Sequence, residues 1–297
     1  MIPGVILIGV FGNTLSMIIF IKTRKRTDAT IQYLTCLALT DTGVLLTLGL
    51  FTWVAYGLDD LTNGASFFHL ATYSGVSCKM ISFVVHTFEC TSAWIIVAFT
   101  VERCYVVWFP LRRATLTPGK RLKIITGIIT LAMTVSLPWL VLMDVYAVGE
   151  EKTCFYKLVH IRFTLWQFDT AILNYIPCCS IFILNVLIFI GVHEAGKSID
   201  RKKYQQNSAK DGNLLISLLV VSTFYVIAMM PMSISFSYQL YLEVYGKGDE
   251  NDLEFIFYLV AFFDEFSMMN YSFNFIIYGC TLPFYRLEVR KMFGLKK

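Results

Sequence analysis

The chain has 297 residues, of which 56% are hydrophobic and only 15% are charged, and its mean hydropathy is +0.62. A soluble domain carries roughly 25% charged residues, so this composition excludes an ordinary water-soluble globular protein and indicates one that lies in a bilayer. The net charge of +4 comes from basic residues between and after the apolar runs. That is a membrane pattern and does not indicate a nucleic-acid partner.

Apolar runs long enough to cross a bilayer, about 17–25 residues each, recur along the chain. We predict seven spans, near residues 2–21, 31–57, 75–108, 121–147, 163–193, 212–244 and 254–279. The runs are continuous and do not alternate as barrel strands do, so the spans are expected to be helices. Basic residues follow the first run and do not precede it, which favours a span over a cleaved signal peptide. The predicted fold class is an all-α membrane protein with one seven-transmembrane domain over residues 1–297.

The basic residues predict the orientation of the chain. Most of the 25 Lys and Arg residues lie after span one, between spans three and four, between spans five and six, and in the tail. Because cytoplasmic loops carry the excess of Lys and Arg, we expect a multi-pass protein of the plasma membrane with its N-terminus outside and its C-terminus inside.

A short segment after span seven, residues 283–293, has Tyr285, Val289 and Met292 on one side, flanked by Arg286 and Arg290. We expect an amphipathic helix that lies on the inner leaflet and contacts membrane lipids. A frayed basic tail is the alternative.

Ionisable residues inside a membrane span are costly, so each is a candidate functional residue. One face of span three combines such residues with apolar ones at steps of three and four: Val85, Glu89, Ser92, Ile96, Phe99 and Arg103. Cys78 lies 25 residues before Arg103, a separation of about 37 Å along a helix, which is enough to cross the membrane.

The surroundings of Arg103 carry a family resemblance. Arg103 follows Glu102 and precedes Pro110 by 7 residues, a pattern that resembles the Asp/Glu-Arg-Tyr motif of the rhodopsin-like (class A) G protein-coupled receptor family. Further motifs stand in order in the other spans: Gly12-Asn13, Leu37-Ala38-Leu39-Thr40-Asp41, Pro177, Pro231 and Asn274-Phe275-Ile276-Ile277-Tyr278. The resemblance covers nearly the whole chain. It implies a receptor that signals to heterotrimeric G proteins, with arrestin as a further partner, by outward movement of span six.

The resemblance implies an activation switch at the inner face. Arg103 would be restrained by Glu102 and by Asp211, because a guanidinium can bind a carboxylate through two parallel hydrogen bonds. Pro231, Asn274 and Tyr278 would belong to the same switch. The alternative is an arginine that only snorkels at a helix end.

The resemblance also implies an allosteric sodium ion, and no other cofactor. Asp41 is a carboxylate deep in the bundle, and Ser92, Asn270 and Asn274 would join it as oxygen ligands, with Asn13 completing the network. The alternative is a sodium-free polar network that holds the helices together. The resemblance further implies a disulfide between Cys78 and Cys154, at the oxidising face of the membrane.

Four positions depart from the family pattern. Cys104 replaces the tyrosine after Arg103, which is a tolerated variation. Met229 stands where the family carries the tryptophan toggle of span six, and Asn185 stands for the tyrosine of span five. Phe275 replaces the proline of span seven, so we expect that helix to be straighter.

The candidate ligand-binding residues line the outer half of the predicted bundle. They are Val85, His86, Glu89, Asp169, Met229, Phe236 and Asp264. Val85 occupies the position of the aspartate in amine receptors, which disfavours a monoamine. The acidic residues would attract a cation, so an extracellular basic neuropeptide, with an Arg-Phe-amide end as one candidate, is the predicted ligand. In the alternative interpretation these acids are solvated charges and the aromatic residues form a membrane-interface belt.

Two other functions stay open. A decoy receptor would bind the ligand without signalling. The departures at Met229, Asn185 and Phe275 favour this alternative, whereas the Glu102-Arg103 pair is evidence against it. A transporter or channel would show internal repeats and broken midplane helices, which we do not find in the sequence. An enzyme is not predicted, because His69, His86, His160 and His193 lack the spacing of a metal or catalytic motif.

Overall fold

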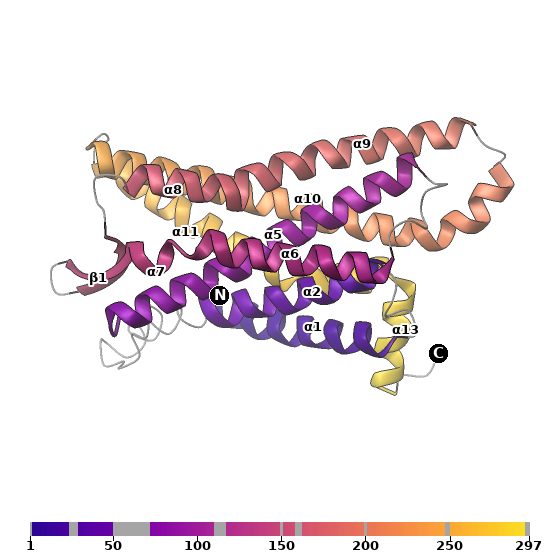
Figure 1. Cartoon of the computed structure of the whole chain (residues 1–297), viewed down its shortest axis with the longest axis horizontal. Coiled ribbons are helices and arrows are strands. Elements are labelled where there is room, and N and C mark those ends of the chain that lie inside the picture. The colour runs from indigo at the N-terminus through magenta and orange to yellow at the C-terminus, as the bar shows by residue number, and fades with distance from the viewer. Residues whose placement is uncertain are drawn as a thin grey trace.

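The computed structural model describes residues 2–23, 29–49, 72–109, 117–148, 151–157, 162–198, 201–246 and 250–294. Long helices lie side by side in an elongated bundle, and a small hairpin sits at one end of it (Figure 1). We call the two ends of the bundle the hairpin end and the α13 end, after the elements found there.

The first half of the bundle consists of α1 (Ile2–Lys22), α2 (Ala29–Val44) and α5 (Gly75–Trp108). A π-helical turn, η1 (Leu45–Gly49), extends α2. The remainder of the predicted second span, residues 50–57, lies outside the described residues. Helix α5 begins at a capping box, because the Ser74 and Ser77 hydroxyls each accept a hydrogen bond from the other residue's backbone N–H.

The second half contains the other long helices. Helix α6 (Pro118–Ser136) leads into the short α7 (Trp139–Leu142). Helices α8 (Arg162–Thr170) and α9 (Ile176–Ser198) are joined by a π-helical turn, η5 (Ala171–Tyr175), and α10 (Arg201–Tyr245) carries Pro231 in its interior. The last bundle segment is α11 (Glu250–Ser272) with α12 (Asn274–Thr281).

Six segments of the described chain are individually long and apolar enough to cross a membrane. They are Pro3–Lys22, Ile31–Leu48, Gly75–Trp108, Pro118–Leu142, Phe163–Glu194 and Gly212–Tyr245. The remaining bundle segment, α11, begins with the acidic residues Glu250, Asp252 and Glu254 and also carries Asp264 and Glu265. Its charge distinguishes α11 from the other six segments, although it packs among them, mainly against α10 and α1.

The predicted helix over residues 121–147 was wrong at its end. The helical part stops at Leu142, and the chain continues as strand β1 (Met143–Val148), which pairs antiparallel with β2 (Glu151–Tyr156). The register sets Val145 opposite Cys154. Residues 143–148 are apolar enough to extend a hydrophobic run, but pairing with β2 satisfies their backbone groups outside the helix.

Span seven is interrupted although Phe275 replaces the proline. The break lies at Phe273, between α11 and α12, where φ is −96° and ψ is 0°. The Ile276 N–H bonds the Phe273 carbonyl at 3.0 Å, which makes a tighter turn than an α-helix. The Ile277 N–H also bonds the Phe273 carbonyl, at 3.2 Å, so the expectation of a straighter helix stays a prediction.

Helix α13 (Pro283–Met292) runs across the end of the bundle (Figure 1). Tyr285 is buried, its hydroxyl lies 2.8 Å from the Ser16 hydroxyl, and its ring packs on Phe20. Arg286 Nη1 donates to the carbonyls of Gly279 and Cys280, at 3.2 and 2.7 Å, and so caps α12. The segment is thus an anchored helix, and part of its apolar side faces the bundle.

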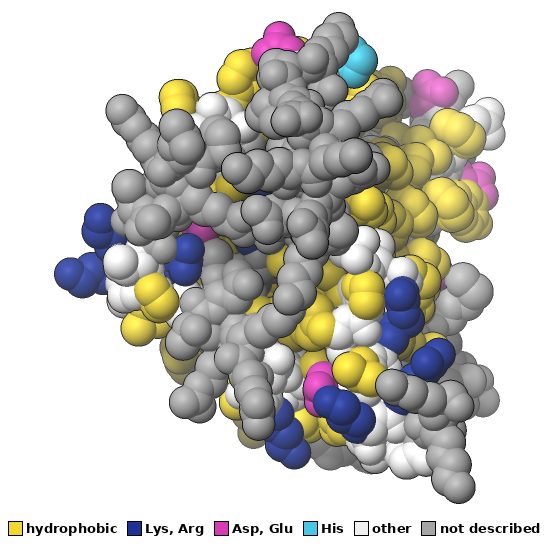
Figure 2. Space-filling view, turned by 90° about the vertical axis from the view of Figure 1, so that its right-hand side faces the viewer, with side chains coloured by type: hydrophobic (Ala, Val, Ile, Leu, Met, Phe, Trp, Pro, Cys, Tyr) yellow, Lys and Arg dark blue, Asp and Glu magenta, His cyan; other side chains and the backbone are white. Residues whose placement is uncertain are grey.

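Figure 2 shows the molecule from the α13 end, where several Lys and Arg side chains lie on the visible face. The helices that begin or end there carry basic residues in their first or last two turns, including Lys22 on α1, Lys120 and Lys123 on α6, and Arg290 and Lys291 on α13. The end of the bundle that carries α13 is therefore the basic one.

Candidate functional site

A buried polar cluster around Asp41 joins four helices in the middle of the bundle. Asp41 on α2 is fully buried. Ser92 on α5 donates to Oδ1 of Asp41 at 2.7 Å, and Asn274 on α12 donates to Oδ2 at 2.6 Å. From α1, Asn13 donates through Nδ2 to the Tyr271 carbonyl at 2.8 Å. Because Tyr271 and Asn274 flank the break at Phe273, these bonds hold the interrupted helix to its neighbours.

The same cluster contains buried acceptors that remain unsatisfied within the described part of the chain. The side-chain oxygens of Asn13, Asn270 and Asn274, together with the Tyr278 hydroxyl, make no hydrogen bond to any described group. All four residues are almost completely buried. Unsatisfied buried acceptors beside a carboxylate are costly, so a bound cation or water would relieve them.

At the α13 end, two adjacent buried residues of α5 carry opposite charge. The Glu102 carboxylate accepts from Arg121 Nε of α6, at 3.0 Å to one oxygen and 3.3 Å to the other. The Arg103 guanidinium lies 5.4 Å from the centroid of the Phe99 ring, within range of a cation–π interaction. Thus the structure gives Glu102 a partner from another helix, where the sequence had suggested Arg103 itself.

The other predicted members of this switch belong to α10 and α12. Asp211 belongs to α10, but its side chain lies outside the described part of the structure, so its predicted pairing with Arg103 stays a prediction. Pro231 is inside α10 and Tyr278 is buried on α12, where its ring packs against Phe20 at 5.4 Å.

Toward the hairpin end, a histidine and an aspartate form a buried pair between α5 and α8. His86 Nε2 lies 2.8 Å from Asp169 Oδ2, and both side chains are about nine-tenths buried. The His86 ring packs at 3.8 Å from the Trp139 ring of α7. The His86 Nδ1 and Trp166 Nε1 atoms are buried without a hydrogen-bond partner among the described residues, so both remain available to a further polar group.

The Glu89 carboxylate lies close enough to this pair to interact with it electrostatically, and the Asp264 carboxylate lies close enough to interact with Glu89. Glu89, one helical turn below His86, interacts with Asp169 and with Asp264 of α11. Of the other predicted ligand residues, Val85 and Met229 are buried, and Phe236 packs on Trp166 with ring centroids 4.3 Å apart. The structure therefore brings three carboxylates from α5, α8 and α11 together with one histidine, which makes this region attractive to a cation.

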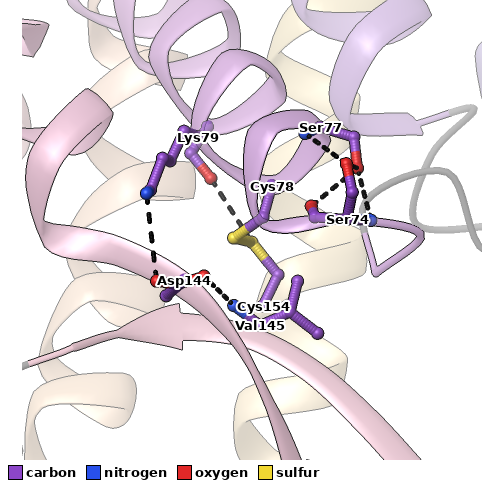
Figure 3. The surroundings of a disulfide bond; sticks show 8 residues. Ser74, Ser77, Cys78, Lys79, Asp144, Val145 and Cys154 are labelled. Atoms are coloured by element: carbon purple, nitrogen blue, oxygen red, sulfur yellow. Dashed lines mark hydrogen bonds and ion pairs between the residues drawn. A yellow bond between two sulfur atoms is a disulfide. The ribbon is translucent and has the colours of Figure 1, made fainter.

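A disulfide ties the hairpin to α5. Cys78, in the first turn of α5, is bonded to Cys154 of β2, with the two Cα atoms 5.6 Å apart (Figure 3). Lys79 and Asp144 add an ion pair of 3.8 Å between α5 and β1, which Figure 3 also shows. The predicted disulfide is confirmed, and it fixes the hairpin against the end of α5 next to the acidic region.

Comparison with known protein families identifies the family of this chain. Residues 12–278 match the model of the 7 transmembrane receptor (rhodopsin family). The chain belongs to the rhodopsin family of seven-transmembrane receptors. The prediction of a seven-helix receptor fold with a short C-terminal helix is thereby confirmed, and the chain is a multi-pass membrane protein.

Individual receptors resemble this one at low identity. The thyrotropin-releasing hormone receptor of Gallus gallus is 27% identical over 187 residues, which are 61% of this chain and 45% of the relative. The probable G-protein coupled receptor 142 of Mus musculus is 25% identical over 202 residues, 68% of this chain and 50% of the relative. The FMRFamide peptide receptor frpr-18 of Caenorhabditis elegans is 34% identical over 129 residues, 43% of this chain and 29% of the relative. The matches thus span half or less of these relatives.

Arg121 is the functional candidate that sequence reasoning did not single out. In the sequence it is one of several basic residues before span four, and its neighbours Lys120 and Lys123 are exposed. A helical projection would have placed it on the same side as Ile125, which is buried. That signal alone could not identify Glu102 as its partner, because the contact depends on how α5 and α6 pack.

Proposed function

We propose that this receptor binds a basic peptide at the hairpin end of its bundle and activates heterotrimeric G proteins at the α13 end. The observation that carries the proposal is the distribution of charge along α5. One helix bears Glu89 in the acidic region, Ser92 on the Asp41 cluster, and Glu102-Arg103 at the basic end. A rigid helix that contacts all three regions can couple them, provided that the bundle has two arrangements.

The ligand class follows from the charge of the acidic region. Three carboxylates, Glu89, Asp169 and Asp264, stand near a single histidine, so a ligand cation would relieve their mutual repulsion. A guanidinium suits such a site, because it is always charged and can bind two carboxylate oxygens at once. The neighbouring Trp166 and Phe236 rings offer a face for a cation or an aromatic side chain. One relative is named as a peptide receptor and another as a hormone receptor, which favours a peptide over a small amine.

The orientation that this function needs agrees with the charges of the chain. The α13 end bears basic residues at the ends of α1, α6 and α13, and cytoplasmic surfaces carry the excess of Lys and Arg. The hairpin with its disulfide would then face the oxidising exterior. We therefore place the protein in the plasma membrane with the acidic region outside, and infer that span six, α10, moves outward at the α13 end to admit the G protein.

A sodium ion fits the Asp41 cluster by its chemistry. Sodium prefers oxygen ligands, and the cluster offers a carboxylate, the Ser92 hydroxyl and the unsatisfied side-chain oxygens of Asn270 and Asn274. We propose that these four residues hold the ion when it is bound. A carboxylate of this burial is otherwise stable only when paired or protonated, so the ion would supply the missing positive charge.

The experiment that tests the proposal is formation of a receptor–G protein complex. The purified receptor in nanodiscs is mixed with a panel of heterotrimers and with basic amidated peptides, and complexes are resolved by size-exclusion chromatography. We expect a complex that needs peptide and dissociates when GTPγS is added. Saturable peptide binding without a complex for any heterotrimer would contradict signalling and favour a decoy receptor.

A further inference from the structure

Arg121 is a basic residue buried near the start of α6. Its side chain is 11% exposed, and in the part of the chain that the structure describes Arg103 is the other buried Lys or Arg. Long cationic side chains are almost never buried unless they are paired. The burial of Arg121 next to exposed Lys120 and Lys123 therefore indicates a specific partner.

That partner is the Glu102 carboxylate, which is 6% exposed and accepts from Arg121 Nε at 3.0 and 3.3 Å. The pair is covered from the α2 side by Tyr33, which is buried, lies close to Glu102, and stacks on Phe99 with ring centroids 5.4 Å apart. Aromatic side chains thus limit the access of water, so each charge depends on the other. Breaking one side of such a pair is costly, because it leaves a buried charge without compensation.

Glu102 stands directly before Arg103, whose guanidinium lies over Phe99. We propose that Arg121 is a positioning residue of the G protein switch: by binding Glu102 it prevents that carboxylate from capturing Arg103. Without Arg121, the Glu102 carboxylate competes for the adjacent Arg103, and the guanidinium is held back from the G protein. This inference rests on the proposed function, since it assigns a role in the same coupling step.

The first test is peptide-stimulated nucleotide exchange by the full-length receptor. We expect Arg121→Gln to lower exchange about tenfold, the size of one hydrogen bond to a charged group, with peptide affinity unchanged. Adding Glu102→Gln should restore exchange, because no carboxylate remains to capture Arg103. Arg121→Lys keeps the charge and should retain most of the activity, and Lys123→Gln is the matched control for loss of a basic residue on α6. Exchange that stays at the native level in Arg121→Gln, or that Glu102→Gln does not restore, would overturn the proposal.

A second measurement does not need the G protein. Thermal unfolding in detergent gives the coupling between Glu102→Gln and Arg103→Gln by a double-mutant cycle. We expect the two changes to be nearly additive in the native background and coupled in the Arg121→Gln background, where the carboxylate has changed partner. If the two changes are additive in both backgrounds, Glu102 does not change its partner, and the proposal fails whatever the nucleotide-exchange assay shows. If Glu102 and Arg103 are coupled in the Arg121→Gln background but the native receptor catalyses no nucleotide exchange, the change of ion-pair partner is supported. The same result would count against the proposed function.

Discussion

The contact between Gly12 and Phe275 offers a sharp test of how the last span is held. Phe275 stands where the family carries proline, and its ring lies against Gly12 of α1. A methyl group added at Gly12 would overlap the Cδ1, Cγ and Cε1 atoms of that ring. The ring cannot give way freely, because the preceding residue, Asn274, is bonded to Asp41 at 2.6 Å. Gly12→Ala should therefore destabilise the receptor.

The magnitude follows from two opposing effects. Replacing glycine by alanine inside a helix stabilises by about 1 kcal/mol, whereas overpacking a filled site costs about 1–3 kcal/mol. Gly4 on the same helix has nothing within 4 Å of an added Cβ, so Gly4→Ala should show only the gain in helix stability. We expect the two alanine variants to differ by the overpacking cost of about 1–3 kcal/mol, with Gly12→Ala the less stable.

The assay is thermal unfolding of purified receptor in detergent, followed by intrinsic fluorescence. Adding Phe275→Ala to Gly12→Ala removes the ring that the methyl group meets, and should recover part of the loss. If Gly12→Ala unfolds at the same temperature as Gly4→Ala, the Phe275 ring does not fill the space beside Gly12.

Three further outcomes are expected. Sodium chloride, compared with potassium chloride, should change peptide affinity by about tenfold in the native receptor, and Asp41→Asn should abolish that difference in a radioligand assay. Glu89→Gln should weaken binding of a basic peptide by roughly 10- to 100-fold, whereas Glu254→Gln, which alters an exposed acid of α11, should leave the measured Kd unchanged. Burial raises the pKa of the Tyr285 hydroxyl above its usual value of about 10. The neutral, buried hydroxyl therefore stabilises the folded state below pH 10. This contribution is lost as the pH rises through the folded-state pKa. Tyr285→Phe should make the unfolding temperature fall less steeply at alkaline pH, and should cost about 1 kcal/mol for the lost hydrogen bond to Ser16. An equally steep fall in the variant would show that Tyr285 does not cause the pH dependence.

The fold class and the disulfide could be predicted because they depend on long, continuous signals. Apolar runs repeat along the chain, and motif residues such as Asp41 and Arg103 stand at family positions within them. A pairing such as Cys78 with Cys154 follows from the same resemblance, and the structure contains it.

The features that could not be predicted depend on contacts between segments. The helix before the hairpin ends at Leu142 because the following residues pair with β2, and hydropathy cannot distinguish an apolar strand from the end of a span. The break at Phe273 occurs without a proline, two residues after the Tyr271 carbonyl that Asn13 of α1 binds. Arg121 looked like a loop charge because its partner, Glu102, is on another helix. In each case the decisive group lies elsewhere in the chain.

Nucleotide exchange with and without the Arg103 side chain decides whether this receptor activates G proteins through Arg103, as we propose. The native receptor, Arg103→Ala and the control Lys123→Ala are compared on the same panel of heterotrimers with a peptide that binds all three. We predict that peptide stimulates exchange by the native receptor and the control but not by Arg103→Ala. Equal exchange with and without the Arg103 side chain, or none by a native receptor that binds peptide, would contradict the account.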